Sequence, residues 1–220
     1  MLPLYDDRQP GRFPFATVLI IAVNAAVFSL WQLHIGLEES VNTGGLVPVL
    51  FLNSHLVPGL AHMVSSMFLH GGWMHLLGNM WFLFVFGKGV EEAAGPVRFL
   101  LFYLICGIAA DYVYIYFSPA SEIPLVGASG AISGVLGGYL VLRPKASITT
   151  LAPYFYSIRL PAWFFLIIWF GMQVLWQAAA VSRHHGGGDV AYAAHTGGFV
   201  AGLLLIFFFK KPVDSLGSNA

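Results

Sequence analysis

The stretch that decides the fold is GASGAISGVLGG, residues 127–138. It is apolar apart from two serines, and its glycines recur every four residues, at Gly130, Gly134 and Gly138. A second stretch, residues 190–209, has the same spacing at Gly198 and Gly202. Repeats of small residues allow the backbones of two membrane helices to approach closely. We therefore expect these two stretches to form helices that pack against each other along their glycines.

The composition indicates a membrane protein. Of the 220 residues, 58% are hydrophobic and only 9% are charged, whereas soluble domains carry about 25% charged residues. The net charge is zero, which gives no reason to expect a nucleic-acid partner. Six apolar segments are long enough to cross a bilayer. We predict an all-α protein with six transmembrane helices at residues 13–33, 73–90, 99–117, 123–142, 160–181 and 190–209.

The positive charges predict the orientation of these segments. Lys and Arg prefer cytoplasmic connections, and here most of them gather in alternate connections, at Arg8, Arg12, Lys88, Arg98, Arg143, Lys145, Arg159, Lys210 and Lys211. The connection between the fifth and sixth segments has only Arg183. Both termini are thus expected on the cytoplasmic side. We expect a short N-terminal segment (1–12), a six-helix membrane domain (13–211) and a tail (212–220). The first connection, residues 34–72, lacks Lys and Arg and is expected to be partly embedded in the membrane.

Polar residues occur where the second, fourth and sixth segments begin. These residues are His75 and Asn79, then Ser129, then His195. The predicted orientation places all three starts near the non-cytoplasmic surface. Polar side chains in a membrane are costly and tend to face an interior cavity. Their common depth therefore predicts one site.

The residue types at this site suggest acyl transfer. Pairing the two glycine stretches brings Ser129 and His195 to similar heights, and a histidine can activate a serine as a nucleophile by accepting its proton. Ser129 also begins a predicted helix, where free backbone N–H groups favour negative charge. His75 and Asn79 could add donors for the oxyanion of a tetrahedral intermediate.

Three stretches resemble the rhomboid intramembrane serine proteases. They are GASG (127–130), AHTGGFVAG (194–202) and HGGWMHLLGNMWFLFVFGKGVEEAAG (70–95). The likeness covers about residues 13–210. It implies a Ser–His dyad in which Ser129 is the nucleophile and His195 is the general base. His75, Asn79 and the backbone of Ser129 would form the oxyanion hole.

The same resemblance implies how the protein meets its substrates. Family members cut transmembrane segments of other membrane proteins, with no metal or other cofactor. Residues 34–72 resemble the membrane-embedded first loop of the family, and the fifth segment resembles a lateral gate through which a substrate enters from the lipid bilayer. Glu91 resembles a structural acid at the inner end of the second segment. We expect a multi-pass protein of a prokaryotic cell membrane with its site open to the non-cytoplasmic side.

Two positions depart from the family pattern. Many members carry an aromatic residue four positions after the nucleophile, packed on the catalytic imidazole, whereas this chain has Ser133 there. Another residue must then orient His195. The Trp-Arg pair often seen in the first loop is absent too, because residues 34–72 contain no arginine.

Other interpretations compete with this one. Ser129 could be a small packing residue, and the protein could bind membrane clients without cutting them, or act as a small transporter. Asp111 could complete a triad, although a local hydrogen-bonded acid is the simpler interpretation. For His70 a structural role is favoured over a second oxyanion donor. His62, His70 and His75 lack the dense spacing of a metal site.

Overall fold

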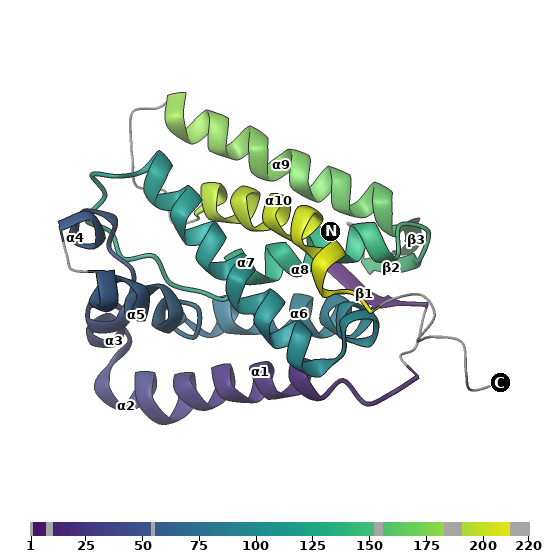
Figure 1. Ribbon diagram of the computed structural model, residues 1–220, viewed down its shortest axis with the longest axis horizontal. Coiled ribbons are helices and arrows are strands. Elements are labelled where there is room, and N and C mark those ends of the chain that lie inside the picture. The colour runs from purple at the N-terminus through teal and green to yellow at the C-terminus, as the bar shows by residue number, and fades with distance from the viewer. Residues whose placement is uncertain (1, 8–10, 54–55, 152–155, 183–190, 212–220) are drawn as a thin grey trace.

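The computed structural model of the chain describes residues 2–7, 11–53, 56–151, 156–182 and 191–211. Most of these residues are helical, and the long helices pack side by side in one bundle (Figure 1). Its helices are α1 (Phe15–Ala26), continued by η1 (Val27–Gln32) and α2 (Leu33–Ile35), then α6 (Trp73–Ala94), α7 (Pro96–Phe117), α8 (Ser129–Leu142), α9 (Ala162–Ser182) and α10 (Tyr192–Phe209). Helices α8 and α10 occupy the middle, with α9 along one edge and α1 along the opposite edge.

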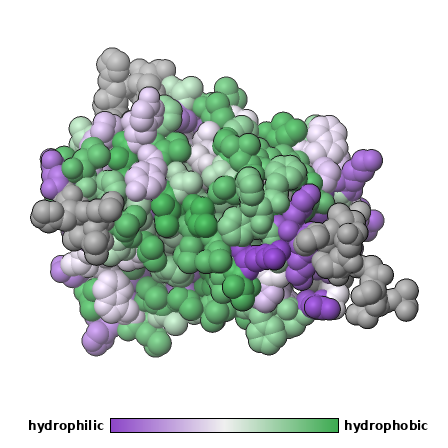
Figure 2. Space-filling model, in the orientation of Figure 1, coloured by the Kyte–Doolittle hydropathy of each residue, from purple (hydrophilic) through white to green (hydrophobic). Residues whose placement is uncertain are grey.

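Four stretches of helix are long and apolar enough to cross a membrane. Within the described residues they are Phe15–Ile35, Pro96–Phe117, Ala162–Ala179 and Tyr192–Phe209. Helix α6 has 22 residues but is more polar, and α8 is shorter. Figure 2 shows apolar side chains over the middle of the visible face and hydrophilic ones mainly toward its left and right edges. The protein is therefore an integral membrane helical bundle, and the crossing of all six helices stays a prediction.

Helix α8 begins later than expected. The segment 123–142 was predicted to be helical throughout, but the helix starts only at Ser129 and has 14 residues. Pro124 and Gly127 explain the difference, because Gly127 has a φ of 123° that a helix does not allow. A helix of this length spans about 21 Å, less than the roughly 30 Å hydrocarbon core. Ala128 and Gly130 on either side of Ser129 are buried, so the start of α8 lies inside the bundle.

The first loop folds into three short helices at one end of the bundle. They are α3 (Leu37–Gly44), α4 (Pro48–Asn53) and α5 (Leu56–Ser66), as Figure 1 shows. The buried Gln32, the last residue of η1, joins the end of this loop to the first helix through hydrogen bonds. Its Oε1 accepts a hydrogen bond from the His70 N–H at 2.9 Å, and its Nε2 donates to the His70 carbonyl at 3.1 Å. The loop is thus anchored just before α6 begins.

The expectation of an all-α protein is wrong in one respect, because a small sheet closes the other end of the bundle. Strands β1 (Leu2–Asp6), β2 (Ser147–Leu151) and β3 (Ser157–Pro161) form an antiparallel sheet in the order β1-β2-β3. The Trp81 indole of α6 donates to the Pro3 carbonyl at 2.5 Å. Part of the expected N-terminal segment 1–12 therefore belongs to the fold, whereas the expected tail 212–220 lies outside the described residues.

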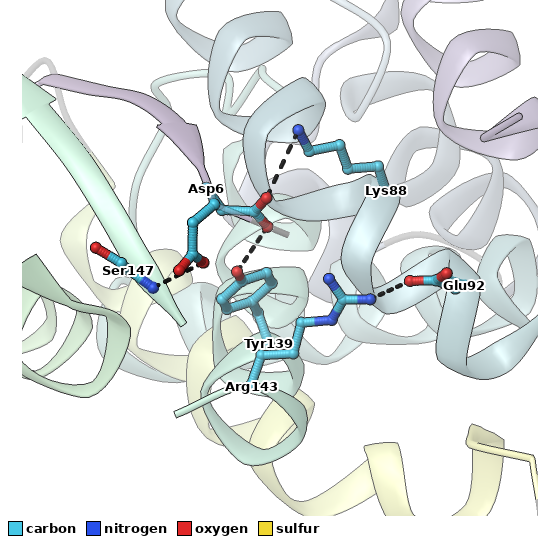
Figure 3. Close-up of polar contacts among 7 residues, drawn as sticks. Asp6, Lys88, Glu92, Tyr139, Arg143 and Ser147 are labelled. Atoms are coloured by element: carbon cyan, nitrogen blue, oxygen red, sulfur yellow. Dashed lines mark hydrogen bonds and ion pairs between the residues drawn. The ribbon is translucent and has the colours of Figure 1, made fainter. Parts of the chain in front are cut away.

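A buried polar cluster fastens this sheet to α6 and α8 (Figure 3). Asp6, at the end of β1, is fully buried and accepts a hydrogen bond from the Tyr139 hydroxyl at 2.7 Å. The buried Lys88 ammonium lies 3.8 Å from the Asp6 carboxylate. Beside them, Arg143 of α8 pairs with Glu92 of α6. The C-terminal ends of both helices are thus held to the N-terminal strand by buried polar contacts and paired charges.

Glu91 caps the first helix from the inner end of α6. Its carboxylate accepts hydrogen bonds from the N–H groups of Ala16 and Thr17 at 2.9 and 2.8 Å, and from the Thr17 hydroxyl at 2.8 Å. The first N–H groups of a helix lack partners within it, and a negative charge beside them is stabilising. Glu91 therefore has the structural role that the resemblance implied for it.

Candidate active site

Two pairs of glycines set the distance between α8 and α10. A Cβ atom on Gly198 would overlap the carbonyl oxygen of Gly130, and one on Gly202 would overlap that of Gly134. The two backbones are therefore in direct contact, with no room for a side chain between them. This contact lies directly after Ser129 on α8 and shortly after His195 on α10, and it brings the starts of the two helices together.

The four-residue repeat of α8 itself faces α7, because a Cβ on Gly130 would lie 2.7 Å from the Cβ of Ala110 and one on Gly134 would overlap the Cβ of Cys106. A Cβ on Gly138 would lie 2.9 Å from the Phe102 ring of α7. It is Gly137, which the four-residue spacing did not mark, that faces the Phe199 carbonyl of α10. The repeat Gly130, Gly134 and Gly138 thus packs on α7, while α10 contacts α8 through Gly137 and through the carbonyl oxygens of Gly130 and Gly134.

Ser129, His195, His75 and Asn79 all line one cavity of about 870 Å³. The structure thus brings together the four polar residues that the sequence placed at one depth. The rest of its lining comes from residues 71–74 at the start of α6, Tyr114 of α7, residues 123–126 and Ala191. A second, mostly apolar pocket of about 310 Å³ adjoins it toward α9 and includes the same four residues. Ser129 and His195 therefore line both the larger cavity, which holds most of the polar groups, and the more apolar pocket beside α9.

The donors around Ser129 are arranged by Gly127. A Cβ on this glycine would lie 2.7 Å from His75 Nε2 and 3.5 Å from Asn79 Nδ2, so both side chains close onto its backbone. The Gly71 N–H donates to His75 Nδ1 at 3.4 Å, which leaves Nε2 to carry the ring proton. Asn79 Nδ2 is enclosed and has no hydrogen-bond partner among the described residues. Two N–H donors thus meet at the turn before Ser129.

His195 is held by a residue that the sequence argument missed. Its Nδ1 lies 2.9 Å from Oε1 of Gln173, a buried residue of α9. The Ser133 hydroxyl turns away and donates to the Ser129 carbonyl at 2.7 Å. Within the described residues the Ser129 hydroxyl makes no hydrogen bond to His195, and such contacts often tighten only when a substrate is bound. The apolar fifth segment carries two amides, Gln173 and Gln177, and a polar side chain in such a segment was the signal that could have revealed Gln173.

Asp111 stands apart from this arrangement. It is buried in α7, and its Oδ2 has no hydrogen-bond partner among the described residues. The acceptor beside His195 Nδ1 is Gln173, so the position of a triad acid is already taken. In the described part of the chain, no three metal-ligating side chains gather into a group that could hold a metal ion.

His70 packs behind His75. It is fully buried in the loop before α6, and its ring meets that of His75 edge to face, with centroids 5.2 Å apart. Burial, aided by the nearby His75, lowers the pKa of His70 to about 3. A neutral ring at this place supports His75 without adding charge to it.

The comparison with known families agrees with this geometry. Residues 58–212, more than half of the chain, match the family model described as the Rhomboid domain. The chain belongs to the rhomboid family. This finding confirms the resemblance carried by the three sequence stretches, and the match includes every helix that lines the cavity.

Curated relatives come from organelles and from bacteria. The chain is 30% identical over 214 residues to "Rhomboid protein 1, mitochondrial" of Saccharomyces cerevisiae, covering 96% of this chain and 57% of the yeast protein. It is 29% identical to "Rhomboid-like protein 11, chloroplastic" of Arabidopsis thaliana, covering 94% of this chain and 69% of that protein. The rhomboid protease GlpG of Haemophilus influenzae is 27% identical over 67% of this chain and 69% of its own length.

The cellular origins of these relatives bear on the membrane in which this protein is expected. Since they come from mitochondria, chloroplasts and bacteria, they do not support the expectation of a prokaryotic cell membrane over an organelle. The chain also spans little more than half the length of the yeast relative.

Proposed function

We propose that this rhomboid protein is an intramembrane serine endopeptidase that cuts transmembrane segments of other membrane proteins with a dyad of Ser129 and His195. The observation that carries the proposal is the cavity in which Ser129, His195, His75 and Asn79 meet at the recessed start of α8. Rhomboid relatives named as proteases support the same class of reaction.

The reaction begins with proton transfer inside the dyad. His195 Nε2 accepts the proton of the Ser129 hydroxyl as the serine oxygen attacks the scissile carbonyl carbon. The tetrahedral intermediate collapses as His195 returns the proton to the leaving amine, and an acyl-enzyme ester remains on Ser129. Water then attacks the ester, again with His195 as the base, which releases the new carboxylate and regenerates the serine.

The oxyanion faces the donors beside Gly127. His75 Nε2–H and the Asn79 amide, with the backbone N–H of Ser129 at the start of α8, surround the position where negative charge develops. An enclosed amide without a partner can bond a group that forms only during the reaction, which is what selective stabilisation of a transition state needs. Removing one such donor typically costs about 10²–10³ in kcat.

The substrate enters sideways from the lipid, past α9. The apolar pocket between Ser129 and α9 is lined by Phe82, Trp169 and Trp176, and it suits the side chains of a membrane segment. The polar cavity opens in the other direction and admits the water needed for deacylation. The charge pattern favours an orientation in which both termini are cytoplasmic and this opening faces the non-cytoplasmic side.

Two other functions fit the features less well. A protein that binds membrane clients without cutting them has no need of an enclosed donor aimed at the turn before Ser129. A transporter needs polar groups along a whole path, whereas α8 is buried and mostly apolar from Ala131 to Tyr139 below the site.

The test is cleavage of a single-span substrate by purified protein in liposomes. Ser129→Ala and His195→Ala are each expected to lower the rate by about 10³-fold or more. Ser29→Ala and His34→Ala change the same residue types away from the cavity and should cut like the wild type. Mass spectrometry of the products locates the cut. Cleavage that survives Ser129→Ala would sink the mechanism, and no cleavage of several substrates by the wild type would favour client binding.

A further inference from the structure

We propose that Gln173 is the positioning residue of the dyad: it fixes His195 in the tautomer whose free Nε2 faces Ser129. The inference rests on the proposed function, because it assigns the role that the resemblance gave to an aromatic residue and that Ser133 cannot fill. It concerns α9, a helix that carries neither member of the dyad.

The hydrogen bond defines the tautomer. Gln173 Oε1 lies 2.9 Å from His195 Nδ1, and an amide oxygen can only accept. His195 Nδ1 must therefore carry the proton, and Nε2 keeps a lone pair that can accept the Ser129 proton. Gln173 is 5% exposed, so water does not readily replace it as the acceptor.

The surroundings of the ring explain why this bond matters in this chain. Ser133 leaves no side chain over the imidazole, because its hydroxyl is bonded to the Ser129 carbonyl. Trp169 is the aromatic neighbour on α9, but its ring is tilted by 34° with centroids 6.2 Å apart, so it does not stack on His195. A hydrogen bond in a site of low dielectric constrains a ring more strongly than such a loose contact.

The position of Gln173 is set by aromatic packing between α9 and α10. Phe170 stacks on Phe199 with ring centroids 4.6 Å apart and an interplanar angle of 22°, and Trp169 contacts the same Phe199 ring at 6.1 Å. These contacts lie about one turn before Gln173 on α9 and one turn after His195 on α10. The catalytic base is therefore correctly oriented only while α9 is seated against α10.

The experiment compares two substitutions of Gln173 with a matched control one turn further along α9. Gln173→Met removes the acceptor with little change in size, and Gln173→Glu keeps an acceptor but adds charge. Gln177→Met makes the same exchange outside the two pockets. Each protein is tested for the rate of Ser129 labelling by a fluorophosphonate, for kcat and KM on a single-span substrate, and for thermal stability.

Gln173→Met should lower kcat and the labelling rate by about 10- to 100-fold, the effect of leaving one buried donor unpaired, with KM nearly unchanged. Gln173→Glu should retain most of the wild-type kcat, because its carboxylate can still accept the hydrogen bond from His195 Nδ1. Its carboxylate favours the protonated imidazole, so the acidic limb of its pH–rate profile should move to higher pH. Gln177→Met should match the wild type in every measurement.

Nitrogen-15 spectra of histidine-labelled protein test the tautomer without relying on catalysis. The signal that His195→Ala removes should show a proton on Nδ1 in the wild type and a mixture of tautomers in Gln173→Met. A wild-type proton on Nε2, or a Gln173→Met protein as active as Gln177→Met, would overturn the inference. A wild type that has the Nδ1 proton but cuts no substrate would overturn the proposed function alone.

Discussion

Gly198 of α10 lies directly against the carbonyl oxygen of Gly130 in α8, the residue that follows Ser129. This contact is between two backbones, so it fixes how closely the helices that carry Ser129 and His195 approach. The geometry of the candidate dyad thus depends on the absence of a side chain at a position that takes no part in the chemistry.

Gly198→Ala should therefore separate the two helices. The added methyl group would overlap backbone, which cannot rotate away, and overpacking of this kind costs about 1–3 kcal/mol. We expect a lower melting temperature in detergent and a loss of cleavage larger than the loss of folded protein.

Gly171→Ala provides the control for that experiment. A Cβ at Gly171 of α9 would meet nothing within 4 Å, and alanine stabilises a helix interior by up to about 1 kcal/mol relative to glycine. If Gly198→Ala proved as stable and active as Gly171→Ala, the close contact would not control the site.

Asn79→Ala should lower kcat by about 10²-fold and leave KM nearly unchanged, because its amide is expected to bond only the oxyanion. Initial rates over a range of substrate concentrations in liposomes would separate the two constants. Asn42→Ala alters an exposed residue of α3 and should change neither. A rise in KM alone after Asn79→Ala would assign Asn79 to substrate binding in the ground state.

Asp6→Ala should destabilise the fold by about 3–5 kcal/mol, since it leaves the buried Lys88 without its paired carboxylate. The effect would show as a lower melting temperature of the purified protein. Asp7→Ala is the matched change one residue further. Asp7 is exposed and accepts one hydrogen bond from the Ser147 N–H at 2.9 Å, so a loss of about 1 kcal/mol is expected there. Equal losses would argue against a buried charge pair.

His70 should make stability depend on pH. The folded protein keeps this ring neutral down to about pH 3, whereas the unfolded chain binds a proton near pH 6.5. The free energy of unfolding therefore decreases as the pH falls from about 6.5 toward about 3, and the loss due to His70 is about 2 kcal/mol at pH 5. His70→Gln removes the dependence, so the stability advantage of the wild type should be smaller at pH 5 than at pH 7. An equal advantage at both values would contradict the assignment.

The sequence predicted the features that arise from local patterns. Apolar segments marked the six bundle helices, and the polar residues at three segment starts do line a common cavity, because helices of known direction bring their ends to one level. The start of α8 was misplaced because an apolar run does not distinguish helix from extended chain, although Pro124 and Gly127 were visible signals.

Contacts between distant parts of the chain could not be predicted in this way. Strand β1 pairs with β2, although Leu2 and its partner Leu151 are far apart in the sequence. Asp6 of β1 likewise contacts Lys88 and Tyr139 only in the folded protein. Gln173 is a similar case. An amide in an apolar segment indicates that it has a partner, but only the packing of α9 on α10 identifies that partner as His195.

The segment that leads into strand β2 also anchors the start of α9. The first N–H groups of α9 are tied down there, with Ala162 bonded to the Ala146 carbonyl at 2.8 Å and Trp163 to that of Pro144 at 3.0 Å. If α9 tilted about this anchor, the helix would act as a lever. Gln173 lies about 16 Å along the lever, so a tilt of about 5° would carry its amide roughly 1.4 Å from the imidazole. A hydrogen bond of 2.9 Å does not survive such a displacement. If Gln173 orients His195 as proposed, an outward tilt of α9 would release the imidazole, and the return of the helix would restore the hydrogen bond.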